Sequence, residues 1–156
     1  MKPTELSTHQ TRVAKPKTVL LADDNDQVRN LIRQALECET HFKICAEATT
    51  GTEAVEKAKA LAPDLIILDV SMPGLNGLEV AGILRYSLPK IQIVMVTMYA
   101  EDISQHFAST FQIDAVFPKS EGLEKLTKHV QSLLADEPKH DEGSTGRLKS
   151  FNRTAR

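Results

Sequence analysis

The sequence predicts an α/β fold in which five strands of one parallel sheet alternate along the chain with five helices. Stretches with helical spacing separate short apolar runs, which lie near 18–22, 43–48, 64–69, 91–97 and 113–117. Repeated strand–helix–strand units of this kind build parallel sheets. Two adjacent carboxylates, Asp23 and Asp24, close the first run, and Asp69 closes the third. Because neighbouring parallel strands open into one crevice at their carboxyl ends, we expect these side chains to meet there.

The helix after the first strand has the clearest pattern. Its apolar residues recur at spacings of three and four, and they are Val28, Leu31, Ile32, Ala35 and Leu36. That spacing puts one apolar face against the sheet, and either Asn25 or Asp26 is placed to cap the amino end.

The two helices in the second half of the sheet are weaker predictions. The helix after Leu75 is interrupted by Gly82 and followed by Pro89, which leaves its ends uncertain. The segment 101–111 is mostly polar, with apolar residues at core spacing only at Ile103, Phe107, Ala108 and Phe111. We expect either a mobile, partner-facing helix or a marginal one there.

The last helix repeats the pattern of the first. Its apolar positions are Leu123, Leu126, Val130, Leu133 and Leu134. Ser120 is the expected cap, and Glu121 and Glu124 are expected in the first turn, where carboxylates interact favourably with the helix dipole. This helix is predicted to close the fold.

The composition fits one compact domain with a tail at each end. The chain has 156 residues, of which 41% are apolar and 26% charged, and this length suits a single core. We expect the folded domain over 17–135 and flexible tails over 1–16 and 136–156, the latter basic. A formal net charge of −2 gives no basic field, which disfavours direct binding of nucleic acid.

Several other classes of site and location are also disfavoured. Cys38 and Cys45 lack the spacing of a zinc site or of a disulfide framework. The histidines are scattered, and each is expected on the surface or in a tail; they are His9, His41, His106, His129 and His140. The apolar runs are far shorter than the roughly 20 residues of a membrane helix, and 1–17 has no signal-type segment. We therefore expect a cytoplasmic protein without membrane contact.

The polar residues at the strand ends predict a Mg²⁺-assisted phosphoryl site. Two or three carboxylates with a main-chain carbonyl and waters suit Mg²⁺, which takes phosphate oxygens as further ligands. The fourth and fifth runs end in Thr97 and in Lys119, whose hydroxyl and ammonium groups suit phosphoryl oxygens. Taken alone, Asp23 and Asp24 are as compatible with a helix cap beside a solvated carboxylate as with a functional site. The joint set favours the phosphoryl site.

Four segments together resemble the receiver domain of bacterial two-component response regulators. They are LADDN at 21–25, PDLIILDVSMPGLNG at 63–77, VMVT at 94–97 and PKS at 118–120. Their order and spacing match the family, and the resemblance covers about 17–135. It implies a doubly wound, flavodoxin-like sheet with the strand order 2-1-3-4-5.

The resemblance also implies the roles of the acidic residues. Asp69 is the expected nucleophile, which accepts a phosphoryl group from a phosphohistidine of a sensor histidine kinase or a phosphotransfer protein. Asp24 and Asp69 are expected to bind Mg²⁺, or Mn²⁺ in its place, directly. Asp23 is expected to bind through water, and the main-chain carbonyl of Ser71 to complete the protein ligands.

The remaining site residues are expected to sense the phosphoryl group or to shape the loop. Lys119 would pair with the phosphoryl oxygens, and Thr97 would turn its hydroxyl toward them, so that the face formed by 98–117 transmits the signal. Pro73 fixes φ in the loop after the nucleophile, and Gly77 permits a turn or a close approach of the backbone.

The sequence departs from the family at the switch residue. The usual aromatic residue three positions before Lys119 is Val116 here. Strand alternation predicts that Phe117 points to the opposite face, into the core. Tyr99 is the candidate substitute for the switch and is also placed to shield an acyl phosphate from water. Gln112 stands where glycine is common, which predicts a different local turn.

These residues favour a stand-alone phospho-acceptor that is not an enzyme for external substrates. About 20 residues follow the last helix, too few for a helix-turn-helix domain. Output is therefore expected through protein contacts, as a monomer or a phosphorylation-dependent dimer. The alternatives are a receiver cut from a DNA-binding transcriptional regulator and a phosphorylation-independent adaptor. A Mg²⁺-dependent phosphatase is disfavoured because its second aspartate, two positions after the nucleophile, is Ser71 here.

Overall fold

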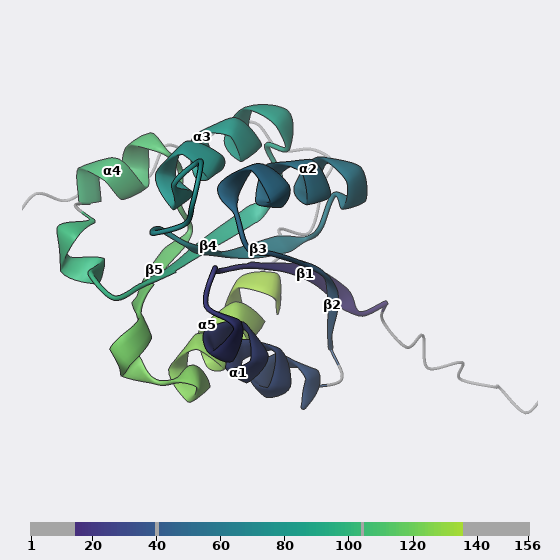
Figure 1. Cartoon of the computed structure of the whole chain (residues 1–156). Coiled ribbons are helices and arrows are strands. Elements are labelled where there is room, and N and C mark those ends of the chain that lie inside the picture. The colour runs from purple at the N-terminus through teal and green to yellow at the C-terminus, as the bar shows by residue number, and fades with distance from the viewer. Residues whose placement is uncertain (1–14, 40, 104, 136–156) are drawn as a thin grey trace, which may run out of the picture.

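One five-stranded parallel sheet forms the centre of the molecule (Figure 1). The computed structural model describes residues 15–39, 41–103 and 105–135. The strand order is β2-β1-β3-β4-β5, which confirms the predicted doubly wound fold. The strands are β1 (Lys17–Ala22), β2 (Phe42–Ala48), β3 (Leu65–Asp69), β4 (Gln92–Thr97) and β5 (Ala115–Pro118). Apart from Lys15 and Pro16, the tails predicted at 1–16 and 136–156 lie outside the described residues.

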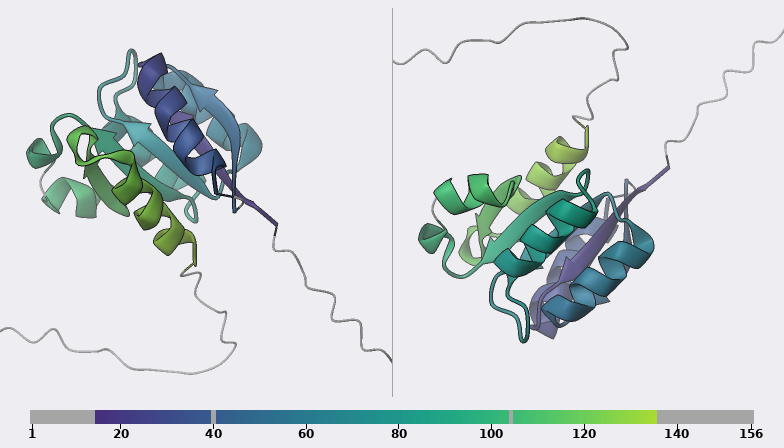
Figure 2. Two further views of the ribbon diagram at one scale, coloured as in Figure 1. Left: turned by 90° about the horizontal axis from the view of Figure 1, so that it is seen from below. Right: turned by 90° about the horizontal axis from the view of Figure 1, so that it is seen from above.

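Helices cover both faces of the sheet. Helices α2, α3 and α4 lie on one face, and α1 and α5 lie side by side on the other (Figures 1 and 2). The helices are α1 (Asp26–Glu37), α2 (Gly51–Leu61), α3 (Gly77–Ser87), α4 (Gln105–Thr110) and α5 (Leu123–Ala135). Two short 3₁₀ helices, η1 (Ala100–Asp102) and η2 (Lys119–Glu121), follow β4 and β5.

The alternation of side chains along the strands divides the core in two. Leu20, Ile66 and Met95 belong to the cluster under α2 and α3. Val19 and Ile67 point the other way, into the cluster with α1 and α5. All five residues of β3 are buried, because a central parallel strand is covered on both faces. The carboxylate at its end therefore lies at the middle of the sheet edge.

Helix α1 begins at the turn that follows β1. The side chain of Asn25 caps the helix, with Oδ1 accepting from the N–H groups of Gln27 at 2.9 Å and Val28 at 3.3 Å. Of the two predicted caps, Asn25 is thus the one used. This cap fixes the exit of the chain from β1 and leaves Asp23 and Asp24 at the strand end.

The predicted start of the last helix is wrong. Helix α5 begins at Leu123, and the expected cap Ser120 and the expected first-turn Glu121 both lie in η2. Gly122, with φ of 87°, separates the two helices. This left-handed backbone is open to glycine, and it turns the chain before α5 begins.

The prediction for one histidine is also wrong. His41 and His106 are exposed as expected, and His9 and His140 lie outside the described residues. His129, however, is half-buried on α5, and its ring meets that of Phe117 edge-on with the centroids 4.9 Å apart. Its place on the sheet-facing side of the helix accounts for the burial.

The α4–β5 region matches the weak sequence signal. Helix α4 spans six residues and buries none of them. Gln112, just after it, has φ of 49°. A non-glycine residue thus adopts the left-handed backbone at the position where glycine is common. Its carbonyl accepts a hydrogen bond from Arg85 of α3, which also pairs with Asp114. This arginine ties the turn to the rest of the fold.

Candidate functional site

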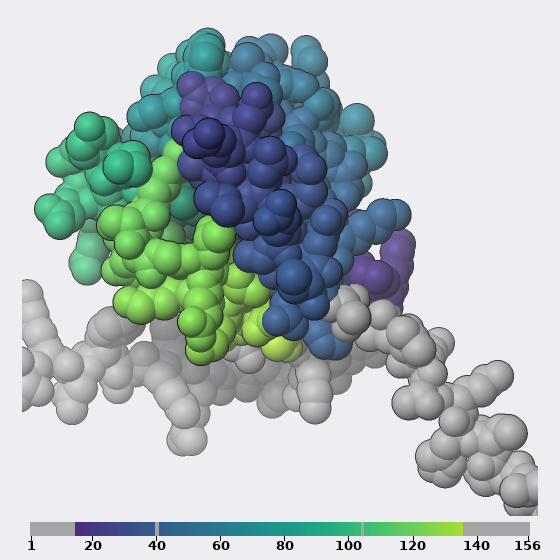
Figure 3. Space-filling view, turned by 60° about the horizontal axis from the view of Figure 1, so that its bottom comes forward, coloured from purple at the N-terminus to yellow at the C-terminus, as the bar shows by residue number. Residues whose placement is uncertain are grey.

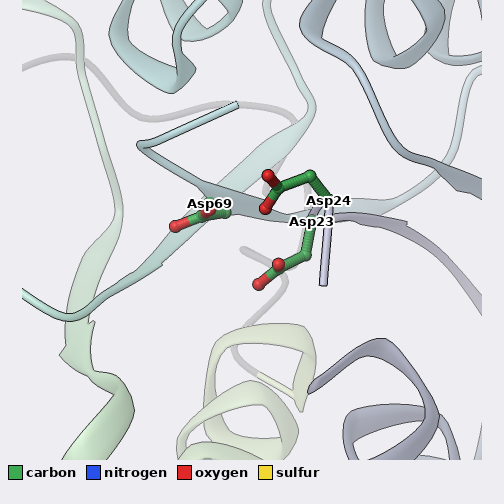
Figure 4. A group of neighbouring side chains, drawn as sticks. All are labelled: Asp23, Asp24 and Asp69. Atoms are coloured by element: carbon green, nitrogen blue, oxygen red, sulfur yellow. The ribbon is translucent and has the colours of Figure 1, made fainter. Parts of the chain in front are cut away.

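The carboxyl ends of β1 and β3 bring three aspartates together. Ala22 pairs with Leu68 in the parallel ladder, so the residues that follow lie at the same level. One carboxylate oxygen from each of Asp23, Asp24 and Asp69 lies within 4.8 Å of the others. Figure 4 shows the three side chains around one point, with Asp24 above and Asp23 below the ribbon. Asp23 and Asp69 are buried, whereas Asp24 is exposed.

Lys119, directly after β5 and first in η2, reaches into this acidic group. Its Nζ lies 2.6 Å from Asp23 Oδ2 and 3.3 Å from Asp69 Oδ1, and its side chain is only 13% exposed. Burial alone lowers the pKa of Lys119, but the hydrogen bond to Asp23 and the charges of both carboxylates outweigh it, so the pKa is raised. The ammonium is therefore held in its charged form.

Asp69 experiences a balance of opposite effects. Burial is the main cause that raises its pKa, and the negative charge of Asp23 adds to it. Lys119 and the N–H group of Ser71 act in the opposite direction without reversing the shift. The ionised Asp69 is thus left under repulsion that a further cation would relieve.

The donor set fits a hard divalent cation. Three carboxylates offer oxygen ligands within a small volume, and Mg²⁺ prefers such ligands together with retained waters. Asp24 is exposed, which leaves one side of the set open to water and to a substrate phosphate.

Thr97 ends β4, which lies beside β3 on the side away from β1 and its two aspartates. It is buried, and its Oγ1 accepts a hydrogen bond from the N–H group of Tyr99 at 3.2 Å. Tyr99 is 68% exposed, and Met98 is 67% exposed. The hydroxyl of Thr97 is thus coupled directly to the main chain that leads into η1.

Val116 and Phe117 point to opposite faces of β5. Val116 packs against the cluster under α2 and α3, while Phe117 packs against the cluster with α1 and α5. The prediction from strand alternation is confirmed. Phe107 on α4 is also partly exposed and stacks on Phe111, so the segment 98–117 presents several apolar side chains.

The loop after Asp69 passes close to the strand end. The N–H group of Gly77 donates to the carbonyl of Val70 at 2.8 Å. A Cβ atom at Gly77 would lie 2.4 Å from the carbonyl oxygen of Asp69, which only glycine avoids. The carbonyl of Pro73 accepts from the N–H group of Gly51 at 3.3 Å, and this bond ties the loop to α2.

The sequence reasoning missed one residue at the site. Arg29 on α1 is 9% exposed, and its Nη1 donates to the main-chain carbonyl of Asp23 at 2.7 Å. Its position at the start of α1, three residues after Asp26 and one after the apolar Val28, resembles that of a solvated surface arginine. The sequence feature that could have indicated this role is an arginine in the first turn of the helix that follows the acidic pair.

Replacing Asp69 with asparagine is expected to stabilise the fold by about 1 kcal/mol at pH 7. The folded state raises the pKa of Asp69, so its ionised form lowers stability above the unfolded pKa. The gain should shrink as the pH falls and both states of the parent become protonated. Urea denaturation at pH 7 and pH 4.5 measures it, with the exposed Asp24→Asn as control. A variant less stable than the parent at pH 7 would contradict this account.

Within the described ranges, every helix is too short or too polar to cross a bilayer.

A family model for the response regulator receiver domain matches residues 19–131. The response regulator protein VraR of Staphylococcus saprophyticus subsp. saprophyticus is 30% identical over 122 residues, which cover 78% of this chain and 58% of that protein. The chain thus spans less than two thirds of the length of the curated relatives it matches.

Solved structures agree with this match. The receiver domain of AraT, a response regulator from Geobacillus stearothermophilus, is 30% identical with a TM-score of 0.69, over 78% of this chain and 97% of that one. A DNA-binding response regulator of the LuxR family from Staphylococcus aureus is 26% identical with a TM-score of 0.70, over 75% and 98%. With the family match and the acidic edge of the sheet, these likenesses identify the chain as a member of the response regulator receiver domain family, the signalling domain of two-component systems.

Proposed function

We propose that Asp69 accepts a phosphoryl group from a phosphohistidine of a sensor histidine kinase or a phosphotransfer protein. The observation that supports this most is the position of Lys119, whose ammonium lies 2.6 Å from Asp23 and 3.3 Å from Asp69. A buried cation beside a strand-end carboxylate suits a group that gains phosphate charge. The proposed folded unit is 17–135. The proposed location is the cytoplasm, where the phosphohistidine of the kinase would also lie.

The proposed step exchanges one bond for another. A carboxylate oxygen of Asp69 attacks phosphorus, an O–P bond forms, and the P–N bond to the imidazole breaks with its electron pair returning to nitrogen. The product is an acyl phosphate on Asp69. Such transfer has a loose transition state, so it needs positioning and charge neutralisation more than covalent chemistry. Lys119 supplies part of that charge from the protein.

The same proposal assigns the cation ligands. Asp24 and Asp69 would bind Mg²⁺, or Mn²⁺ in its place, directly, while Asp23 would bind through water and Ser71 through its main-chain carbonyl. When bound, the cation neutralises charge on the transferring group. The closeness of the three carboxylates supports this assignment.

The output is proposed to leave through the face formed by 98–117. The hydroxyl of Thr97 accepts from the N–H group of Tyr99, so turning that hydroxyl toward a phosphoryl oxygen would change the main chain that follows. Tyr99 and Val116 take the place of the usual aromatic switch. The exposed side chains of Met98, Tyr99 and Phe107 suit contact with a protein partner or, after phosphorylation, a second copy. The chain acts on no external substrate and does not bind nucleic acid directly.

A second candidate is a receiver that controls a DNA-binding effector. A structure similar to this chain is described as a DNA-binding response regulator of the LuxR family, and the VraR relatives extend beyond the matched region. In that case the 98–117 face would contact an effector domain. The phosphoryl chemistry at Asp69 would be the same.

Intact mass spectrometry after incubation with Mg²⁺ and acetyl phosphate tests the acceptor. We expect one phosphoryl adduct on the parent and none on Asp69→Asn or with excess chelator. Asp102→Asn, which removes an exposed carboxylate from η1, should keep the adduct. An adduct that persists in Asp69→Asn, or its absence from the folded parent, would refute the proposal.

A further inference from the structure

Arg29 is a second buried cation at Asp23, which it contacts at the main-chain carbonyl, whereas Lys119 contacts the carboxylate. It lies on α1, which lies beside α5 on one surface of the molecule (Figure 3). We propose that Arg29 is a positioning residue that fixes the peptide between Asp23 and Asp24 and thereby sets the affinity of the site for a divalent cation. This inference rests on the cation site of the proposed function.

The guanidinium of Arg29 contacts three parts of the chain. Its Nη1 donates to the main-chain carbonyl of Asp23 at 2.7 Å. Its Nε donates to Glu47 Oε2 on β2 at 3.1 Å, and its Nη2 pairs with Asp26 in the first turn of α1. Because the planar guanidinium has donors in fixed directions, these contacts determine its orientation.

Every hydrogen-bonding group of Asp23 has a partner. Its N–H group donates to the carbonyl of Ala48 at 3.1 Å, and its own carbonyl accepts from Arg29. Its Oδ1 accepts from the N–H group of Asn25 at 2.9 Å, and its Oδ2 faces Lys119. Arg29 thus holds the one group of Asp23 that belongs to the peptide leading to Asp24.

The strand β2 braces this arrangement from the side. Glu47 and Ala48 are adjacent, so one segment of β2 accepts the N–H group of Asp23 directly and holds its carbonyl through Arg29. The other carboxylate oxygen of Glu47 pairs with Arg33, and Lys57 of α2 donates to the main-chain carbonyl of Glu47. Lys57 therefore holds the segment of β2 that orients Arg29 independently of Arg33, whose side chain is 35% exposed.

The orientation of this peptide matters because Asp24 is the exposed member of the acidic group. Because its side chain is exposed, we expect its direction to depend on the backbone that precedes it. Mg²⁺ demands near-octahedral geometry, and outer contacts that orient ligands commonly change metal affinity by about 10- to 100-fold. Loss of the Arg29 bond should accordingly weaken cation binding without removing a ligand.

Binding of Mn²⁺, followed by the electron paramagnetic resonance signal of the free ion, tests the inference. Arg29→Met is expected to raise the dissociation constant about 10-fold. The matched control is Arg33→Met, which removes the other guanidinium from Glu47 and leaves the Asp23 bond in place; its constant should stay within about two-fold of the parent. With acetyl phosphate, Arg29→Met should need more Mg²⁺ but approach the parental rate at saturation.

Three results would overturn the inference. They are a parental constant for Arg29→Met, an equal weakening by Arg33→Met, or a parent that binds no Mn²⁺. The last would also remove the cation from the proposed function, whereas a missing phosphoryl adduct with the expected Mn²⁺ constants would reject phosphoryl transfer alone. If Arg29→Met does not fold, Arg29→Lys decides. One ammonium cannot reproduce the three-way fork, so we expect about three-fold weaker binding, and a parental constant would refute the role.

Discussion

Replacing Lys119 with methionine is expected to slow phosphorylation of Asp69 at least about 100-fold and to destabilise the fold at neutral pH. The substitution removes the ammonium that lies between Asp23 and Asp69. The side chains of these two aspartates are each only 5% exposed. Removing one partner of a buried ion pair leaves uncompensated charge, at a cost of about 3 kcal/mol.

The loss of stability should depend on pH. In the parent, the folded state raises the pKa of Lys119, so its contribution is complete at neutral pH and is lost only as the pH rises through the folded-state value. In Lys119→Met, Asp69 loses the cation that opposes the upward shift, so the pKa of Asp69 rises further. The variant should therefore regain stability as the pH falls and the folded state takes up a proton.

Urea denaturation at pH 7.5 and pH 5, with acetyl phosphate kinetics at neutral pH, checks both parts. Lys125→Met is the matched control. The Lys125 side chain is 68% exposed, and its Nζ lies as far as 3.9 Å from Glu121 Oε2. Exposed pairs of this kind contribute little, so the control should behave as the parent. Equal stability of Lys119→Met and the parent at pH 7.5 would argue against a structural role for this ammonium.

Replacing Gly77 with alanine is expected to destabilise the fold by about 2–3 kcal/mol. A Cβ atom there would lie 2.4 Å from the carbonyl oxygen of Asp69 and 2.8 Å from Cα of Val70. Both are backbone atoms at the end of β3, so the clash cannot be relieved by a side-chain rotation. The strand end itself must shift, and a displacement of about 1 Å at a reacting group can cost roughly 100-fold in rate.

Gly82→Ala in the same helix is the control for this substitution. Its Cβ would lie 3.3 Å from the ring of Phe111, a side chain that can adjust, and alanine favours the helix by up to about 1 kcal/mol. Its stability should therefore stay within about 1 kcal/mol of the parent. Urea midpoints and acetyl phosphate rates of both variants check the contrast, and a Gly77→Ala protein with parental values in both would contradict it.

The strands and the acidic edge were predictable because their causes are local. Continuous apolar runs such as 65–68 indicate a strand buried on both faces, and a carboxylate directly after such a run must lie at the sheet edge. Asp23, Asp69 and Lys119 meet because parallel strands share that edge. Their exact contacts, by contrast, depend on side-chain directions that the strand pattern does not determine.

The features that the sequence did not reveal depend on tertiary contacts. Arg29 has the sequence surroundings of a surface residue, and its burial follows from the carboxylates of Glu47 and Asp26. His129 is covered by Phe117, which lies on β5 twelve residues earlier. The start of α5 depends on the backbone angle of Gly122, which Ser120, a good cap by residue type, gave no reason to expect.

The lack of buried residues in α4 has a thermodynamic consequence for signalling. Segments with little buried apolar surface open at a small fraction of the global unfolding free energy, so amide hydrogens of 105–110 should exchange far faster than those of β3, whose residues are all buried. A ligand can shift an equilibrium only by its differential affinity for the two states. Under the proposed function, a single phosphate would therefore need only a small differential affinity to shift the conformation of this helix, while the sheet that holds Asp69 stays unchanged.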